Sequence, residues 1–241
     1  MSTYVLIHGG WHGSWCWNRL APLLQKAGHH VIAPDLPGHG LDKTPVAARP
    51  YELYVPRVCD VLEEQDERVI LLGHSSGGNI ITSVAELRPE KIKVLVYLTA
   101  FLTIGHSPRE MMNEDAESIL TECFFRDENQ LTVSIIPERA REVFYADCSD
   151  EVAEWAINQL IPEPIVRLNE SRVPTTFDNF ERIPRVYIEC LQDKALGPKT
   201  QKRMYTALPC RKVYSLSTSH SPFLSDPHGL ASCLLDIERV F

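Results

Sequence analysis

Runs of apolar and β-branched residues recur along the chain and predict its strands. The runs are nearly continuous rather than alternating between apolar and polar positions, which is typical of strands buried on both faces of a sheet. They lie at Tyr4–His8, Val31–Pro34, Arg68–Leu72, Lys93–Leu98, Arg185–Cys190 and Arg211–Leu216. The pattern therefore predicts six strands in a parallel sheet.

Helical patterns separate these runs. Trp17–Gly28 ends at a glycine and Gly77–Leu87 stops before Pro89, and both features are common signals for the end of a helix. The remaining helical segments are Tyr51–Glu64, Lys199–Leu208 and Gly229–Phe241. Each helix connects successive strands or closes the chain, as the right-handed crossovers of a parallel sheet require. We therefore expect an α/β fold with helices on both faces of the sheet.

The alternation of strands and helices fails between about Leu102 and Arg182. No convincing strand is visible there, and the segment is helix-prone. Residues 105–182 contain seven basic and seventeen acidic side chains, a net charge of −10, whereas the rest of the chain has a net charge of +2. This acidity indicates either a solvated outer helix face or an electric field that disfavours anionic substrates.

We expect this segment to be an insertion after the fourth strand. It would cover the carboxyl edge of the sheet, where open α/β sheets bind their ligands. The predicted organisation is a core of residues 1–102 and 183–241 and a small helical cap of residues 103–182.

Composition narrows the class of protein. The 241 residues have a net charge of −8, which gives no electrostatic reason to expect nucleic acid or an anionic membrane surface as a partner. No apolar stretch is long enough to span a membrane, and no charged segment precedes the first run, so neither anchoring nor secretion is expected. The seven cysteines are odd in number and lack metal-like spacing. They indicate reduced thiols and a cytoplasmic location.

The strongest motif is the Gly-x-Ser-x-Gly sequence at residues 73–77, which follows an apolar run and opens a helix. In a nucleophile elbow the serine occupies a strained turn, and the glycines let strand and helix approach closely. The same pattern also arises by chance in glycine-rich turns. The flanking strand and helix favour the elbow, with Ser75 as the nucleophile.

A serine nucleophile needs a base, and the base needs a carboxylate that fixes its tautomer. Asp193 follows the fifth run and His220 follows the sixth, in the chain order that this kind of fold uses. Glu189 competes with Asp193, but it lies inside a buried run, where a structural ion pair is the preferred interpretation. Two further candidates follow too late in the chain, Asp226 and His228.

Two backbone N–H groups must face the oxyanion of the tetrahedral intermediate. We expect one from Ser76, the residue after the nucleophile, and one from Gly10 in the loop after the first strand. His8 and His12 lie four residues apart in that loop, but glycines separate them, and a hydrogen-bonded structural role is favoured over a metal site.

Several segments together resemble the α/β-hydrolase subgroup that contains plant methyl-ester esterases and hydroxynitrile lyases. The resemblance lies in Val5–Trp17, Gly73–Gly78, Arg185–Lys194 and His220 with Leu224 and Pro227. It implies a sheet order of 2-1-3-4-5-6, no cofactor and often a homodimer. It also implies that Ser75, Asp193 and His220 are nucleophile, acid and base, with oxyanion amides from Gly10 and Ser76.

Two positions separate the branches of this subgroup. The lyases carry a threonine where this chain has Gly10 and a lysine where it has Ser221. That lysine stabilises the departing cyanide, and a serine supplies no such charge. The esterase branch is therefore favoured, although the plant esterases commonly have methionine at the position of Ser221.

The leading hypothesis is a serine hydrolase that cleaves a small neutral ester or carbamate through an acyl-enzyme on Ser75, with no metal. The alternatives are lyase-like or cofactor-free oxygenase chemistry with His220 as base, and a slow-turnover ligand receptor. Trp11 is a candidate to reach the substrate pocket. Four further aromatic side chains are expected to contact the substrate or else to form the core of the cap: Phe101, Phe124, Phe125 and Trp155.

Overall fold

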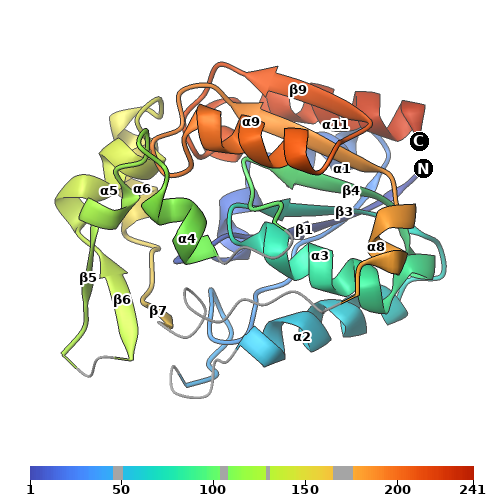
Figure 1. The fold of residues 1–241 in the computed structure, drawn as a ribbon, viewed down its shortest axis with the longest axis horizontal. Helices are drawn as coiled ribbons and strands as arrows, with labels where there is room; N and C mark the ends of the chain where they lie inside the picture. The colour runs from blue at the N-terminus through green and yellow to red at the C-terminus, as the bar shows by residue number, and fades with distance from the viewer. Residues whose placement is uncertain (46–50, 104–107, 129–130, 165–175) are drawn as a thin grey trace.

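The computed structural model describes residues 1–45, 51–103, 108–128, 131–164 and 176–241 (Figure 1). At its centre is a six-stranded sheet of order β2-β1-β3-β4-β8-β9, in which every neighbouring pair is parallel. Its strands are β1 (Thr3–Ile7), β2 (His30–Ile32), β3 (Val69–His74), β4 (Ile92–Leu98), β8 (Arg185–Cys190) and β9 (Lys212–Leu216). The six predicted runs and the predicted order are confirmed.

Burial along the strands explains why the sequence shows them as apolar runs. Every residue of the central strand β3 is buried, and β4 is buried except at Lys93. A strand covered on both faces must be apolar at nearly every position. The edge strand β9 is exposed at three of its five residues, because helices and neighbours cover an edge strand less completely.

Helices cover both faces of the sheet. Helix α1 packs against α11 on one face, whereas α2, α3 and α9 lie on the other (Figure 1). Their bounds are α1 (Ala21–Lys26), α2 (Tyr51–Glu63), α3 (Gly77–Leu87), α8 (Asp178–Arg182), α9 (Pro198–Ala207), α10 (Pro222–Ser225) and α11 (Pro227–Val240). No described helix is long and apolar enough to cross a membrane.

The first helix is shorter than the sequence predicts. A 3₁₀ turn, Ser14–Trp17, comes first, and α1 then begins at Ala21 with Pro22 in its first turn. Proline lacks the N–H that a helix interior requires and is tolerated only at the helix start. A helix running from Trp17 would have placed Pro22 in its interior.

The segment after β4 contains helices α4 (Pro108–Asn113), α5 (Pro137–Phe144) and α6 (Asp150–Ile157). It also contains an antiparallel sheet of order β5-β6-β7, so the expectation of no strand there is wrong. The strands are β5 (Phe124–Arg126), β6 (Thr132–Ile135) and β7 (Glu163–Pro164). Strands this short show no clear periodicity, and they do not join the central sheet. Strands β5 and β6 and helices α5 and α6 lie beyond one end of the central strands (Figure 1).

Candidate active site

The candidate residues lie at the carboxyl edge of the central sheet. Gly10 follows β1, Ser75 follows β3, Thr99 follows β4, Asp193 follows β8 and His220 follows β9. Because the strands are parallel, their carboxyl ends meet at one edge, which is where open α/β sheets bind ligands. The fold therefore brings together residues that lie far apart in the sequence.

Backbone strain is concentrated at this edge. Among the described residues, three that are not glycine have a positive φ: Trp11 at 61°, Ser75 at 52° and Thr99 at 36°. Each lies shortly after a strand of the central sheet. A side chain in the left-handed region raises the energy of the backbone, and such residues cluster at functional sites. Ser75 thus has the strained turn that a nucleophile elbow requires.

Close packing explains the glycines that flank Ser75. A Cβ atom on Gly73 would lie 2.7 Å from the carbonyl oxygen of Gly77. A Cβ on Gly77 would lie 2.9 Å from the carbonyl oxygens of both Ile7 and His8. Backbone atoms cannot move aside as a flexible side chain can. The turn therefore excludes any larger residue at either position.

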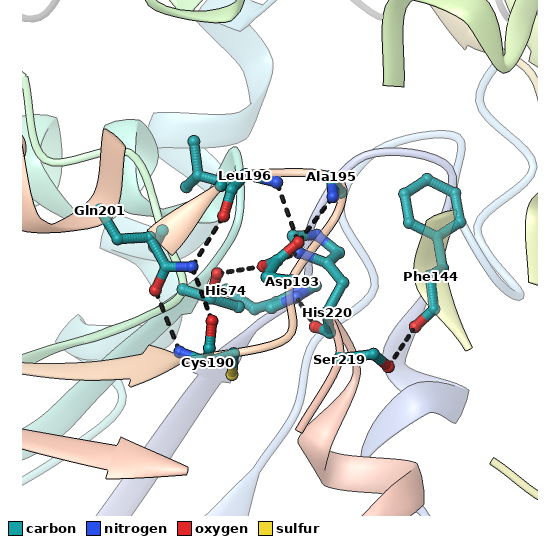
Figure 2. Close-up of polar contacts among 12 residues, drawn as sticks. His74, Phe144, Cys190, Asp193, Ala195, Leu196, Gln201, Ser219 and His220 are labelled. Atoms are coloured by element: carbon teal, nitrogen blue, oxygen red, sulfur yellow. Dashed lines mark hydrogen bonds and ion pairs between the residues drawn. The ribbon is translucent and has the colours of Figure 1, made fainter. Parts of the chain in front are cut away.

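Asp193 and His220 form a buried pair (Figure 2). The His220 Nδ1 atom lies 2.6 Å from Oδ2 of Asp193, and both residues are 2% exposed. Oδ1 of Asp193 accepts hydrogen bonds from the backbone N–H groups of Ala195 and Leu196, at 2.6 and 2.9 Å. The hydroxyl of Thr99 donates to Oδ2 at 2.5 Å. These donors favour an ionised carboxylate that holds a proton on Nδ1 and leaves Nε2 as the basic nitrogen.

His74 packs the elbow against His220. Its Nε2 atom donates to the carbonyl oxygen of His220 at 2.9 Å, and the two ring centroids lie 4.6 Å apart. Burial lowers the pKa of His74 well below its ordinary value, so the ring is neutral. Among the described residues, no hydrogen bond joins Ser75 Oγ to the His220 ring. Catalytic hydrogen bonds of this kind often tighten only when substrate binds.

Gln201 braces the loop that carries Asp193 (Figure 2). Its amide oxygen accepts from the Cys190 N–H at 3.0 Å, and its amide nitrogen donates to the carbonyl oxygens of Cys190 and Leu196. The sequence analysis missed both Gln201 and Thr99. Thr99 directly follows the fourth run, which is a positional signal, whereas Gln201 lies inside a helix and carries none.

The loop after β1 lies directly against the elbow. A Cβ on Gly9 would lie 2.9 Å from the Cβ of Ser75, and a Cβ on Gly10 would lie 3.6 Å from the Oγ of Ser76. Within the described residues, the backbone N–H groups of Gly10 and Ser76 donate to no other protein group. Gly10 and Ser76 thus lie side by side at the elbow.

The two loop histidines hold backbone carbonyls. Nδ1 of His8 lies 2.9 Å from the carbonyl oxygen of Gly9, and Nδ1 of His12 lies 2.7 Å from that of Gly10. The Tyr145 hydroxyl lies 2.8 Å from His12 Nε2. Burial lowers the pKa of His12 to about 4. His8 also accepts the N–H of Leu36 on Nε2 at 3.2 Å, so both rings act as hydrogen-bonding groups. The described residues contain no group of three or more metal-type ligands.

The predicted substrate contacts fall in different places. Trp11 is buried, and its ring packs 5.8 Å from Phe144, whose ring lies 5.6 Å from that of His220. Phe101 is buried and donates its backbone N–H to the carbonyl oxygen of Ser75 at 3.0 Å. Trp155 is 37% exposed and packs edge-on against Trp15. No described contact joins it to Ser75, Asp193 or His220.

The competing carboxylates have other partners. Glu189 accepts hydrogen bonds from the hydroxyls of Tyr205 and Ser215, at 3.0 and 2.7 Å. The expectation of an ion pair for Glu189 is therefore wrong. Among the described residues, its partners are hydroxyl groups. Asp226 accepts from the N–H of Gly229 and caps the start of α11.

Known proteins share this architecture. The model of the alpha/beta hydrolase family matches residues 4–232. Methylesterase 1 of Arabidopsis thaliana is 31% identical, and the match covers 99% of this chain and 96% of the relative. The pyrethroid hydrolase of Sphingobium wenxiniae is 34% identical, and the match covers 98% of this chain and 87% of the relative. The crystal structure of the methylesterase MES16 from Arabidopsis superposes with a TM-score of 0.88, at 25% identity and complete coverage of both chains.

These relatives confirm the resemblance to plant methyl-ester esterases, and they are named esterases and hydrolases. The chain therefore belongs to the alpha/beta hydrolase family.

Proposed function

We propose that this protein is a serine hydrolase that cleaves a small neutral carboxylic ester or carbamate through an acyl-enzyme on Ser75. The observation that carries the proposal is the buried Asp193–His220 pair, in which Oδ2 of Asp193 lies 2.6 Å from Nδ1 of His220. The pair lies at the same edge of the sheet as the elbow serine, Ser75, whose φ is 52°. The names of the relatives support the reaction class, because they include a methylesterase, an aldehyde esterase and a hydrolase.

In the proposed reaction, Ser75 Oγ attacks the ester carbonyl and transfers its proton to Nε2 of His220. The negative oxygen of the tetrahedral intermediate accepts hydrogen bonds from the N–H groups of Gly10 and Ser76. Collapse of the intermediate breaks the ester bond, and the alcohol leaves with the proton from His220. Water then repeats the sequence on the acyl-enzyme, with His220 as base and then acid.

Asp193 supports both steps without changing its own protonation. Its Oδ2 atom holds the Nδ1 proton of His220, so Nε2 faces the reaction in the basic tautomer. When Nε2 takes up the serine proton, the ring becomes positively charged, and the adjacent carboxylate stabilises that charge. The Thr99 hydroxyl and two backbone N–H groups keep this carboxylate in place.

The residue after His220 favours ester hydrolysis over lyase chemistry. Ser221 is fully buried, and its hydroxyl has no hydrogen-bond partner among the described residues. A neutral hydroxyl at this position cannot stabilise cyanide as a lysine would. Ester hydrolysis is therefore preferred to hydroxynitrile cleavage as the proposed reaction.

The proposal includes a cap. We propose that the predicted cap, residues 103–182, covers the site through its segments up to β7, and that residues 1–102 and 183–241 form the catalytic core. The last helix of the predicted cap, α8, packs against α3 of the core instead. Asp147, which lies in the cap segment, accepts hydrogen bonds from both the N–H and the hydroxyl of Ser219, beside the catalytic base. The seven free cysteines agree with a reducing, cytoplasmic compartment.

Hydrolysis of a chromogenic short-chain ester such as p-nitrophenyl acetate tests the proposal. The unaltered chain should turn it over, whereas Ser75→Ala and His220→Ala should not. Ser83→Ala is the matched control, because this buried serine in α3 binds a helix carbonyl away from the site. Full turnover by Ser75→Ala together with loss in His220→Ala would indicate base chemistry without an acyl-enzyme. Ligand binding without turnover would indicate a receptor.

A further inference from the structure

Trp11 is held by the cap segment through each of its three polar groups. Its indole N–H donates to the carbonyl oxygen of Val133 at 2.9 Å, and its own carbonyl accepts from the N–H of Ile161 at 3.0 Å. Its backbone N–H donates to Oε2 of Glu163, also at 2.9 Å. A tryptophan with a φ of 61° needs such contacts to stay in place. The strained turn after β1 is thus fixed from outside the core.

Glu163 is the charged member of this arrangement. It belongs to β7, is fully buried, and lies 124 residues from its second partner, His39, whose Nε2 is 2.9 Å from the same Oε2 atom. A Cβ on Gly10 would lie 3.5 Å from that oxygen. A cap carboxylate therefore lies beside the residue that is proposed to bind the oxyanion.

A carboxylate at this position must not oppose the negative charge that develops on the substrate. Both ring nitrogens of His39 face groups that accept, the carbonyl oxygen of Pro37 at 3.2 Å and the carboxylate of Glu163. The His39 ring therefore donates to the carboxylate of Glu163 at 2.9 Å, and this donor offsets part of the negative charge beside Gly10.

Side-chain hydrogen bonds hold the two peptide groups on either side of the Gly10 Cα atom. His8 binds the carbonyl of Gly9, His12 binds the carbonyl of Gly10, and Glu163 binds the N–H of Trp11. The Gly10 N–H is part of the peptide whose carbonyl His8 holds, and Glu163 fixes the next peptide along. Rotation of the Gly9–Gly10 peptide would turn the Gly10 N–H away from the site, and the fixed Gly10–Trp11 peptide restricts the backbone next to it.

We propose that Glu163 is a positioning residue that sets the Gly10 N–H for the oxyanion, and so couples the docked cap to catalysis. The inference rests on the proposed function. A carboxylate that only stabilised the fold would change thermal stability, whereas one that positions an oxyanion donor must change the rate of the chemical step more than substrate binding.

Glu163→Ala and Glu163→Gln test the proposal with p-nitrophenyl acetate as substrate and phenylboronic acid as a tetrahedral inhibitor. Loss of one oxyanion donor lowers kcat by about 10²-fold in comparable sites, so Glu163→Ala should lower kcat by about that factor while KM changes far less. Phenylboronic acid should bind correspondingly more weakly. Glu163→Gln keeps an acceptor oxygen for the Trp11 N–H and should recover most of kcat.

Glu86→Ala is the matched control. Glu86 is also a buried carboxylate that accepts backbone N–H groups, those of Asn179 and Phe180, but it lies in α3 away from the site. Its loss should lower stability and leave kcat and the boronate affinity unchanged. If Glu163→Ala does not fold, Glu163→Asp serves instead, because its shorter carboxylate cannot reach the Trp11 N–H and should also lower kcat selectively.

The inference is overturned if the folded Glu163 variants keep kcat, or if they raise KM alone. That failure is distinct from failure of the proposed function. With an inactive Ser75→Ala, an unchanged kcat in Glu163→Ala removes only the positioning role. A fully active Ser75→Ala removes the acyl-enzyme mechanism whatever Glu163 does.

Discussion

Single residues at the carboxyl edge of the sheet combine strain with dense hydrogen bonding. Ser75 and Thr99 have positive φ values, and the Asp193 carboxylate accepts two backbone N–H groups and a hydroxyl in addition to the His220 ring. Such an arrangement keeps reactive groups in one geometry before substrate arrives. It avoids the reorganisation that a flexible site would undergo in each reaction cycle.

Ser75 and His220 should behave as one unit in kinetics. Each of Ser75→Ala and His220→Ala should lower kcat by about 10⁴–10⁶-fold, and the double variant should be little worse, because neither residue acts without the other. Steady-state kinetics on a chromogenic ester measures this. Additive losses would indicate independent functions.

Asp193→Asn should keep the geometry of the loop but present the wrong tautomer of His220. The expected loss of kcat is about 10⁴-fold. The same ester assay, with thermal unfolding as a check that the variant folds, measures it. An unchanged rate would assign the supporting carboxylate elsewhere.

The pKa of His12 predicts a pH-dependent stability. Burial lowers its folded-state pKa to about 4 from the ordinary 6.5, so between these values the unfolded chain binds a proton that the folded chain does not. The stability contributed by the neutral ring is complete above about pH 6.5 and falls as the pH drops toward 4. Buried His74, whose pKa is also lowered, acts in the same direction.

Urea unfolding at pH 7 and pH 5 measures this effect. His12 alone should reduce the free energy of unfolding by about 2 kcal/mol between the two pH values. His12→Asn keeps a donor for the Gly10 carbonyl but does not titrate, so its stability should fall by correspondingly less. Equal losses in both proteins would show that His12 is not the titrating group.

The sequence was informative about residues that follow strands and uninformative about residues that support them. Ser75, Asp193 and His220 could be selected because each follows an apolar run and their order along the chain has a mechanism. Thr99 contacts Asp193 across 94 positions, and Glu163 contacts Trp11 across 152. No local pattern marks such pairs, because only the folded chain brings them together.

At the scale of elements, the strand-to-helix turn at Ser75 depends on how closely β3, α3 and the end of β1 approach. Gly77 lies where a Cβ would meet two backbone carbonyls at 2.9 Å. The sequence predicted this close approach from the two glycines of the motif. It did not predict β5, β6 and β7, because strands of two to four residues are too short to show a clear periodicity.

Gly77→Ala should destabilise the fold by about 2 kcal/mol or more, since the backbone of β1 must shift to admit the methyl group. Gly28→Ala is the comparison, because nothing lies within 4 Å of its added Cβ and only its φ of 90° opposes the change. That strain amounts to about 1 kcal/mol. Urea unfolding of both variants measures the difference, and a Gly77→Ala protein as stable as Gly28→Ala would contradict the close approach.

The whole molecule carries its negative charge in the segment proposed as the cap. Residues 105–182 have a net charge of −10, and the rest of the chain is slightly positive. Three arginines of this segment are candidates to pair with an anionic substrate: Arg109, Arg126 and Arg167. Arg126 is exposed on β5. The side chain of Arg109 and all of Arg167 lie outside the described residues.

A neutral ester should therefore react faster than a matched ester that bears a free carboxylate. The difference should lie in kcat/KM and should narrow as salt is added, because exposed charges are screened within about 10 Å at 0.1 M salt. The neutral ester loses only its hydration and gains about 25 cal/mol for each Å² of apolar area buried. A preference for the anionic ester that high salt weakens would show that the cap attracts anions.

Intact-mass spectrometry after reaction with a serine-directed organophosphate tests the central claim most directly. We expect one covalent adduct on the unaltered chain, located on the peptide that contains Ser75, with ester hydrolysis lost in proportion to labelling. Ser75→Ala should gain no adduct under the same conditions. An adduct on another residue, or labelling of Ser75 that leaves hydrolysis intact, would contradict an acyl-enzyme mechanism at this elbow.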